Sequence, residues 1–491
     1  MNILFLMGPA FMRMGQDLME QIKATSDADV TFTVLNSGDD RHRRRILARF
    51  PEGVEVLNLA ELEKEWFTAA VTTEQMTALE TTYGPGILGR TILSDRRICG
   101  GFVNQPVRHT ALPKDWLTDS AKTHYVCNLY SYLEKIILKA DLVFCYAVAG
   151  APAFAIGNIA KNQDIPFQQF SPLRIKNYYG LDQEINDRLE NLAAREPDTE
   201  SIYKSRVFLS EYRKRPSVPE YQVSLTGKNK SKILLRQRQA LIRLISKTFQ
   251  YIRSPSRQRA LRVKNQFQEF IFEVRAVFDK ENLKKLDGGL PSRFWYFPLQ
   301  VEPEATTMIL APWLSNQELV IELIAKSLPP GVSLLVKEHP SMLGRRRPGY
   351  YKRLRSFPNV ELVDSSRSQF HLMEKAELSI VNTGTTSIEA LFLRRPFAVL
   401  SQNYLTTFFP ENTFSGQLSE LPNFLSNCAS MAPKSDVHIE DMIARLLTGA
   451  VEIDNDVLWG GHQAAKPETL SRLAGQILAA AGATVSDPTA S

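Results

Sequence analysis

Two short polar segments in the second half of the chain carry side chains suited to binding an anion. The first is Lys337-Glu338-His339-Pro340, at the end of a strand expected over residues 333–337. Lys337 and His339 can each donate a hydrogen bond to an anionic oxygen, and Pro340 ends the strand and turns the chain. In the alternative interpretation, His339 only caps the strand end.

The second segment spans residues 382–391 and reads Asn-Thr-Gly-Thr-Thr-Ser-Ile-Glu-Ala-Leu, between an expected strand and an expected helix. Gly384 permits close approach of a ligand to the backbone. Three successive hydroxyl groups follow, on Thr385, Thr386 and Ser387. Because N–H groups at a helix start favour negative charge, this composition is typical of a phosphate-binding loop. Glu389 either binds a ribose hydroxyl or closes a capping box and only satisfies its own helix.

A third loop follows the first strand expected in this half, and it contains Gln300 and Glu302 between two prolines. If the strand register is right, these polar side chains point towards the ligand, and we predict that both contact it. The alternative is a solvated loop that Pro298 and Pro303 make rigid.

Polar residues also follow strands expected in the first half of the chain. Arg13 and Asn36 come after the first two strands, and Arg174 and Asp182 come after a later strand that ends at Phe170. We expect Arg13 and Asn36 to line a binding surface. Arg174 could neutralise an acidic ligand, and Asp182 is a candidate general base. The alternative for Asp182 is an ordinary acid in a surface loop.

The order of the expected elements explains why these segments would meet. Strands alternate with helices over residues 1–36 and 125–170, and again over 291–400, which predicts parallel sheets covered on both faces. In open parallel sheets, ligands bind outside the carboxyl ends of the strands. The sequence therefore predicts an α/β fold with two Rossmann-like, doubly wound domains facing a cleft.

We expect four segments along the chain. Residues 1–182 form the first α/β domain, and residues 183–290 form a basic helical insertion. Residues 291–482 form the second α/β domain with terminal helices, and residues 483–491 form a disordered tail.

The predicted insertion holds most of the positive charge of the chain. Residues 204–264 contain 17 Lys and Arg but only two acids, Glu211 and Glu220, whereas the whole chain of 491 residues has a formal charge of +6. Three interpretations of this basic segment remain open: it contacts an anionic membrane surface, it binds an anionic polymer, or it is a solvated basic face. No nucleic acid is expected as a partner, because no recognition motif accompanies the charge.

Missing patterns exclude several classes. The chain has neither G-x-x-x-x-G-K-[ST] nor G-x-G-x-x-G, so a P-loop ATPase and a dinucleotide dehydrogenase are not expected. Its four scattered cysteines form no C-x-x-C pair, which fits a reducing cytosol and argues against a thiolate metal site. The D-x-D pairs follow no strand expected at the cleft, so no metal site is predicted.

Two apolar stretches are predicted to be parts of the fold. The run at residues 3–7 has no basic leader and favours a buried strand over a signal peptide. Residues 142–160 lack charge over a length that could span a bilayer, but Gly150-Ala151-Pro152 divides them. We predict a strand, a turn and a helix there, and no transmembrane segment.

Taken together, these motifs resemble the capsule polysaccharide biosynthesis family, the KpsC/KpsS and LipA/LipB type of transferases. The likeness covers about half the chain, roughly residues 1–40, 125–182 and 290–405. Its most specific part is Phe-Trp-Tyr-Phe-Pro-Leu-Gln-Val-Glu-Pro-Glu at residues 294–304, and the His-Pro motif is shared more widely. Residues 167–171 depart from the family, because many members have acidic residues and a glycine there. The acceptor and the catalytic base can therefore differ.

The resemblance implies a GT-B fold and CMP-sugar donors such as CMP-Kdo, with no metal required and no cofactor. Carried over, His339 would contact the CMP phosphate. Asp182, the candidate general base from its place after a strand, is not part of this carry-over, and we count both residues as catalytic. The hydroxyls of Thr385, Thr386 and Ser387 would hold the same phosphate.

The leading hypothesis is a cytoplasmic glycosyltransferase, peripheral to the inner face of the membrane, that acts on a polysaccharide or glycolipid acceptor. One alternative is a nucleotide-sugar 2-epimerase of the same fold. The other is a non-catalytic protein that escorts anionic polysaccharide.

Overall fold

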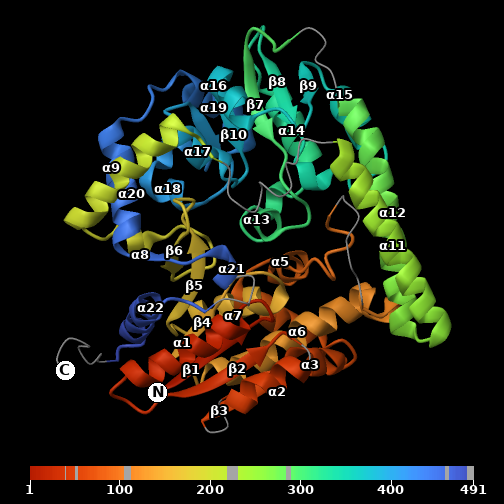
Figure 1. Cartoon of the computed structure of the whole chain (residues 1–491), viewed down its shortest axis with the longest axis vertical. Helices are drawn as coiled ribbons and strands as arrows, with labels where there is room; N and C mark the ends of the chain where they lie inside the picture. The colour runs from red at the N-terminus through yellow and green to blue at the C-terminus, as the bar shows by residue number, and fades with distance from the viewer. Residues whose placement is uncertain are drawn as a thin grey trace. The chain divides into compact units, whose positions relative to one another are not determined.

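Two mainly parallel β-sheets organise the chain, and each belongs to a separate unit (Figure 1). The computed structural model describes residues 1–38, 40–49, 53–103, 112–217, 230–283, 289–458 and 464–483. The first unit consists of Met1–Asp95, Lys114–Arg206 and Glu440–Ser491, and the second consists of Arg96–Pro113 and Val207–Ile439. The predicted disordered tail falls, from residue 484 on, outside the described residues.

The sheet of the first unit has seven strands in the order β12-β6-β5-β4-β1-β2-β3. The strands are β1 (Asn2–Met7), β2 (Thr31–Asn36), β3 (Val54–Asn58), β4 (Leu142–Cys145), β5 (Phe167–Pro172), β6 (Tyr178–Asp182) and β12 (Val451–Glu452). Strands β1 to β5 pair in parallel, and β6 and β12 add an antiparallel edge. The parallel strands thus follow the order 3-2-1-4-5 of a Rossmann-like half.

Helices flank this sheet, and the last described helix packs beside the first one (Figure 1). The helices are α1 (Met12–Thr25), α2 (Asp40–Arg49), α3 (Leu59–Trp66), α4 (Thr73–Tyr83), α5 (Ile87–Ser94), α6 (Asp119–Ile137), α7 (Ala151–Asn162), α8 (Glu190–Ala193), α21 (Asn455–Leu458) and α22 (Pro467–Ala480). Helices α9 (Thr199–Lys214) and α20 (Asp436–Thr448) each belong partly to the first unit and partly to the second. Leu473 and Ile477 of α22 are fully buried in the same core as Phe5 of β1 and Leu18 of α1. Burial of this apolar helix face is what joins the end of the chain to its beginning.

The units divide the chain differently from the predicted domain ranges. The terminal helices expected to complete the second α/β domain belong to the first unit, because α22 fills the core over β1. The expected insertion at residues 183–290 is also divided, with its first part in the first unit and its two long helices in the second.

The sheet of the second unit has five parallel strands in the order β11-β10-β7-β8-β9. The strands are β7 (Phe294–Pro298), β8 (Ser333–Lys337), β9 (Val360–Val363), β10 (Leu378–Val381) and β11 (Phe397–Val399). The helices that accompany them are α13 (Ala305–Met308), α14 (Gln317–Lys326), α15 (Tyr350–Arg355), α16 (Gln369–Lys375), α17 (Thr386–Phe392), α18 (Tyr404–Phe408) and α19 (Leu421–Ser430). Renumbered from β7, the strand order is again 3-2-1-4-5. The predicted fold class of two Rossmann-like, doubly wound α/β parts is therefore confirmed.

Two long helices, α11 (Lys230–Arg253) and α12 (Arg257–Leu283), run side by side in the second unit as a helical hairpin (Figure 1). Gly344 lets α12 approach the loop after β8, since it has φ +78° and a β-carbon there would lie 1.9 Å from the Phe272 carbonyl oxygen. The Gly344 N–H donates to Asp279 of α12 at 2.8 Å, and Arg345 pairs with Glu269 at 3.0 Å. The hairpin is thus fixed to the loop that follows His339.

Two sequence expectations have clear outcomes in the first unit. The uncharged stretch at residues 142–160 forms β4, a turn and most of α7, as predicted. Asp182 was expected in a loop, but it ends strand β6, which pairs with β5 at the sheet edge. No helix within the described ranges is both long and apolar enough to cross a membrane.

Candidate functional site

The carboxyl ends of β7 and β10 form the topological switch point of the second sheet. Strand β7 lies at the centre, β10 is its neighbour on one side and β8 on the other. After β7 the chain continues to β8 on one side, and it later crosses back to place β10 on the other side of β7. The connections that follow β7 and β10 therefore run in opposite directions. A crevice between such loops is the usual ligand site of open α/β sheets. The three segments singled out in the sequence of this half all follow these strands.

Gln300 spans this switch point. The Gln300 side-chain amide faces the backbone N–H groups of Thr383 at 3.2 Å and Gly384 at 3.0 Å, and its oxygen is assigned to that side because the amide nitrogen cannot accept from them. Its side chain lies so close that a β-carbon on Gly384 would meet it at 3.0 Å. An amide oxygen therefore occupies two N–H groups of the segment that was predicted to bind a phosphate.

Lys337 and His339 lie at the end of β8, on the other side of β7. Lys337 is buried, and its ammonium group makes no hydrogen bond or ion pair with any residue in the described ranges. Burial lowers the pKa of Lys337, while Glu389 of α17 opposes this shift. Lys337, at the end of β8, and Glu389, in the helix after β10, therefore attract each other electrostatically.

The ring of His339 is held in one tautomer by its own loop. Nδ1 accepts a hydrogen bond from the backbone N–H of Ser341 at 3.3 Å and lies 2.7 Å from the Ser341 hydroxyl. Burial, assisted by Lys337 and opposed by Glu338, lowers the pKa of His339 to about 4. At neutral pH the ring is uncharged, and since Nδ1 accepts, its proton is on Nε2. His339 therefore caps the chain after β8, which was the alternative interpretation of the sequence. Its Nε2–H group is still available as a hydrogen-bond donor.

A fully buried arginine joins the loops after β7 and β8. Arg346 donates to both carboxylate oxygens of Glu338, at 2.9 and 3.0 Å, and to Glu302 at 3.1 Å. It also donates to the backbone carbonyl of Gln300 at 2.8 Å. Although burial opposes its charge, attraction to Glu338 raises the pKa of Arg346. Gln317 completes the network by donating to Glu302 and to the Gln300 carbonyl.

This network corrects the prediction for Glu302. The carboxylate was expected to point towards the ligand, but it is 5% exposed and turned inward onto Arg346 and Gln317. Glu302 therefore stabilises the loop that carries Gln300. The sequence interpretation missed Arg346 because the run Arg345-Arg346-Arg347 resembles a solvated basic segment. The available signal was that Glu302 and Glu338 each follow an apolar strand, where a carboxylate needs a cation from elsewhere in the chain.

The hydroxyl groups after Gly384 are not all directed outward. Ser387 is fully buried and its hydroxyl donates to the Gly384 carbonyl at 2.9 Å, so it shapes the turn. Thr386 is also buried, whereas Thr385 is partly exposed. The predicted capping box is not formed, because Thr385 is the N-cap and Glu389 instead accepts a hydrogen bond from Gln369 at 2.7 Å.

In the first unit, Arg13, which follows β1, is exposed, whereas Asn36, at the end of β2, is buried. Arg13 is exposed at the start of α1, just beyond the carboxyl end of β1. Asn36 is fully buried and donates to Asn58 at 2.9 Å, while its oxygen accepts from the Gly38 N–H at 2.9 Å. Asn36 thus joins the ends of β2 and β3 and is not placed to touch a ligand.

Asp182 and Arg174 do not form a pair. Asp182 is 2% exposed, one oxygen accepts from the Glu184 N–H at 3.1 Å, and burial together with Asp187 raises its pKa to about 7. Arg174, with φ +64°, lies in the β5–β6 turn, and its charge partly opposes the burial that raises the pKa of Asp187 to about 6. A carboxyl group titrating near neutral pH suits a general base, but its burial limits contact with an acceptor. Its catalytic role stays a prediction.

Comparison with known proteins gives a likeness of fold. No protein-family model and no curated protein matches the chain. The beta Kdo 2,7 transferase KpsC of Thermosulfurimonas dismutans is 11% identical with a TM-score of 0.35, covering 70% of this chain and 89% of that chain. The beta Kdo 2,4 transferase KpsC of the same organism is 12% identical with a TM-score of 0.36, covering 71% and 94%. A UDP-GlcNAc 2-epimerase from Neisseria meningitidis is 13% identical with a TM-score of 0.27, covering 91% and 98%. These likenesses carry no functional conclusion.

The buried network makes a stability prediction. We expect Arg346→Gln to lower the free energy of unfolding by about 3–5 kcal/mol, because it leaves the Glu302 and Glu338 carboxylates buried without their cation. Arg293→Gln is the matched control. Its side chain is 53% exposed and pairs with Glu377, which is 34% exposed, so the loss in this variant should stay below about 1 kcal/mol. Urea unfolding followed by circular dichroism measures both, and equal losses would contradict the role given to Arg346.

Proposed function

We propose that the chain is a metal-independent glycosyltransferase that uses a CMP-activated, Kdo-like sugar as donor. The second unit binds the nucleotide, and the first unit binds a polysaccharide or glycolipid acceptor. The observation that carries this proposal is the contact between Gln300 and the N–H groups of Thr383 and Gly384 at the switch point. An oxygen already accepts from both groups, and a phosphate oxygen of a nucleotide can replace it.

The surrounding charges suit a leaving group that becomes more negative as the sugar departs. Lys337 supplies a buried positive charge on one side of β7. His339 supplies a neutral N–H donor whose orientation is fixed by Ser341. Donors that are oriented before the reaction stabilise developing charge without reorganising. Gly384 and Thr385 would then contact the phosphate, Glu389 a ribose hydroxyl, and Arg13 and Arg174 an acidic acceptor.

A nucleotide-sugar 2-epimerase is the weaker proposal for this site. That reaction moves a proton at a sugar carbon and needs an available acid or base beside the ring. The first carboxylates after β7 and β8 are Glu302 and Glu338, and both are engaged by the buried Arg346. The next one, Glu304, caps the start of α13. Transfer from a nucleotide donor requires no such group from these two loops.

Nucleotide binding tests the proposal and separates it from a non-catalytic escort of polysaccharide. We expect isothermal titration calorimetry to detect CMP binding, with CDP and UDP bound more weakly. His339→Asn should weaken CMP binding by about 1–3 kcal/mol, the scale of a hydrogen bond to a charged acceptor. Asparagine can still accept from the Ser341 N–H as an N-cap residue does, so the loop is kept while the Nε2–H is lost.

His339→Gln is the converse control for this test. Glutamine carries an N–H group near the position of Nε2, so much of the CMP affinity should return even though the cap is weakened. Equal affinity in the wild type and the asparagine variant would remove His339 from the nucleotide site. No binding of any of the three nucleotides would favour the escort function.

We further propose that the hairpin of α11 and α12 docks the enzyme on the inner face of an anionic membrane. Five apolar side chains recur on one face of α11 at spacings of three, four or seven residues, and all are more than half exposed: Leu235, Ile242, Ile245, Phe249 and Ile252. The sequence between Tyr221 and Gln268 contains no acid, and exposed cations such as Arg238 and Arg243 accompany the stripe. An apolar stripe flanked by cations is typical of a helix lying in a lipid interface.

Vesicle sedimentation tests this docking. We expect binding to vesicles that contain phosphatidylglycerol and much less to vesicles of phosphatidylcholine, with binding falling as salt rises, since each cation near the surface contributes about 1 kcal/mol. Ile245→Glu combined with Phe249→Glu should reduce binding at least tenfold. Leu418→Glu, at a 60% exposed leucine elsewhere in the second unit, should leave it unchanged. Equal binding to both lipids would contradict an electrostatic contact.

A further inference from the structure

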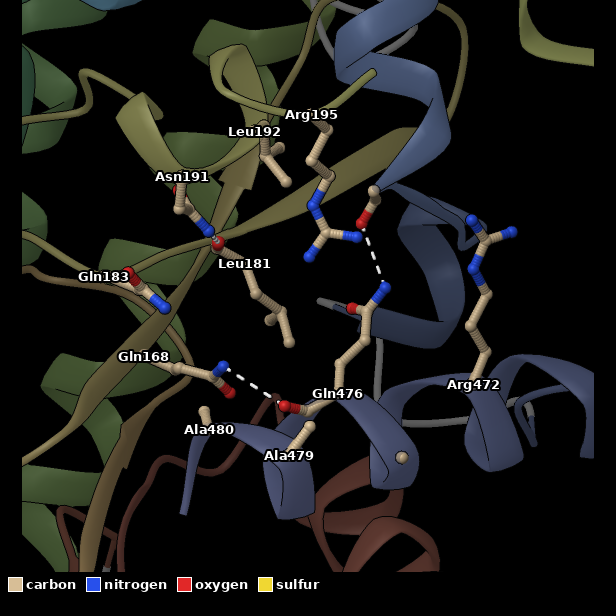
Figure 2. A pocket seen from close by; sticks show the side chains of 12 residues that line it. Gln168, Leu181, Gln183, Asn191, Leu192, Arg195, Arg472, Gln476, Ala479 and Ala480 are labelled. Atoms are coloured by element: carbon tan, nitrogen blue, oxygen red, sulfur yellow. Dashed lines mark hydrogen bonds between the residues drawn. The ribbon is translucent and has the colours of Figure 1, made fainter. Parts of the chain in front are cut away.

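The first unit contains a cavity that none of the functions above uses. Its volume is about 480 Å³, and it lies between β5 and β6, the short helix α8 and the face of α22 (Figure 2). Every residue that lines it belongs to the first unit. Gln168, on its wall, is the second residue of β5, so the cavity is away from the carboxyl ends of the parallel strands. Its volume is that of a site for a small molecule.

Two side-chain amides, of the buried Gln168 and the half-buried Asn191, lie on the wall of this cavity. Gln168 is 4% exposed, and its nitrogen donates to the Gln476 carbonyl at 3.4 Å. Asn191 donates its nitrogen to the Leu181 carbonyl at 2.8 Å. The side-chain oxygens of Gln168 and Asn191 accept no hydrogen bond from the described residues. Both oxygens are covered by neighbouring atoms. A buried acceptor without a donor costs about 1–3 kcal/mol, so turning either amide towards a ligand hydroxyl group in the cavity would be favourable.

The charge of the cavity is positive. Figure 2 shows the Arg195 guanidinium directed towards the middle of the lining side chains, while Arg472 lies on the outer side of Gln476. Arg195 makes no ion pair within the described residues, and its Nε would lie 3.0 Å from a β-carbon on Gly449. No acidic residue is among those that line the cavity. A guanidinium without a carboxylate partner suits an anionic group of a ligand.

Apolar side chains complete the wall. Leu181 and Leu192 lie on the strand and α8 side, and Ala479 and Ala480 lie on the α22 side. Gly475 also faces the cavity, and a β-carbon there would meet no atom within 4 Å. The cavity thus combines an apolar surface, acceptors for hydroxyl groups and a cation.

We propose that this cavity is a binding site for an anionic sugar, carboxylated or phosphorylated. The sugar hydroxyls donate to Gln168 and Asn191, its acidic group pairs with Arg195, and its C–H face packs on the leucine and alanine side chains. A neutral sugar lacks the ion pair, and a small inorganic anion lacks the hydroxyl donors. The site stands on its own geometry. Only its use as a subsite for an acidic acceptor chain rests on the proposed transferase function.

Ligand titration of the full-length chain tests the proposal, using glucuronate, glucose 6-phosphate and neutral glucose as probes. We expect saturation-transfer NMR to detect binding of at least one of the two anions, and glucose to bind at least tenfold more weakly. Binding of glucuronate alone identifies a carboxylated ligand, and binding of glucose 6-phosphate alone a phosphorylated one. Absence of binding by both anions would overturn the proposal.

Two variants locate the binding within this cavity. Arg195→Gln should weaken anion binding at least tenfold, whereas Arg44→Gln, at an exposed arginine of α2 in the same unit, should not change it. Gly475→Leu fills open space, so it should keep the circular dichroism spectrum and abolish binding. Retained binding in Gly475→Leu would contradict the assignment. CMP binding should be unaffected in both variants, so failure of the transferase proposal is recognised separately, by loss of CMP binding in the wild type.

Discussion

The buried charge of Arg346 is the constraint on which the candidate nucleotide site depends. One guanidinium binds Glu338 after β8, Glu302 after β7, and the backbone carbonyl of Gln300. Two carboxylates and a cation withdrawn from water are stable only when all three are present and well oriented. The loops after β7 and β8 are therefore fixed relative to each other, and the positions of Gln300 and His339 follow.

The remaining parts of the site are arranged around that fixed point. Gln300 reaches from the loop after β7 to the N–H groups of Thr383 and Gly384, which joins the third loop to the other two. The hydroxyl of the buried Ser387 donates to the Gly384 carbonyl and stabilises this turn. The same loop after β8 receives α12 at Gly344 and Arg345, so the basic hairpin is anchored a few residues from His339. Proposed nucleotide binding and proposed membrane docking therefore share one rigid segment.

The amino-acid sequence predicted the sheets well because parallel strands buried on both faces are continuous apolar runs. The range predicted for β8, residues 333–337, agrees with the structure at both ends. Strand β6 was missed because Tyr-Tyr-Gly-Leu-Asp is short, contains a glycine, and becomes a strand only by pairing with β5 at an edge. The apolar face of α22 could be recognised, but not the core that it would fill.

The candidate site was predicted in outline, and its details depend on partners that are distant in sequence. The loops after β7, β8 and β10 were identified from polar residues at strand ends, since that rule follows from topology alone. The orientation of Glu302 was wrong because it is set by Arg346, 44 residues further along the chain. The neutral state of His339 could not be foreseen either, because its pKa is lowered by burial, which the sequence does not reveal.

Calorimetry with CMP on two variants of Gln300 tests most directly whether a phosphate replaces the Gln300 amide at the N–H groups of Thr383 and Gly384. Gln300→Glu sets a permanent carboxylate beside those groups and should weaken CMP binding at least tenfold. Gln300→Ala exposes the same N–H groups and should bind CMP at least as tightly as the wild type. If both variants bind CMP with the affinity of the wild type, the nucleotide lies elsewhere and the account of this site is wrong.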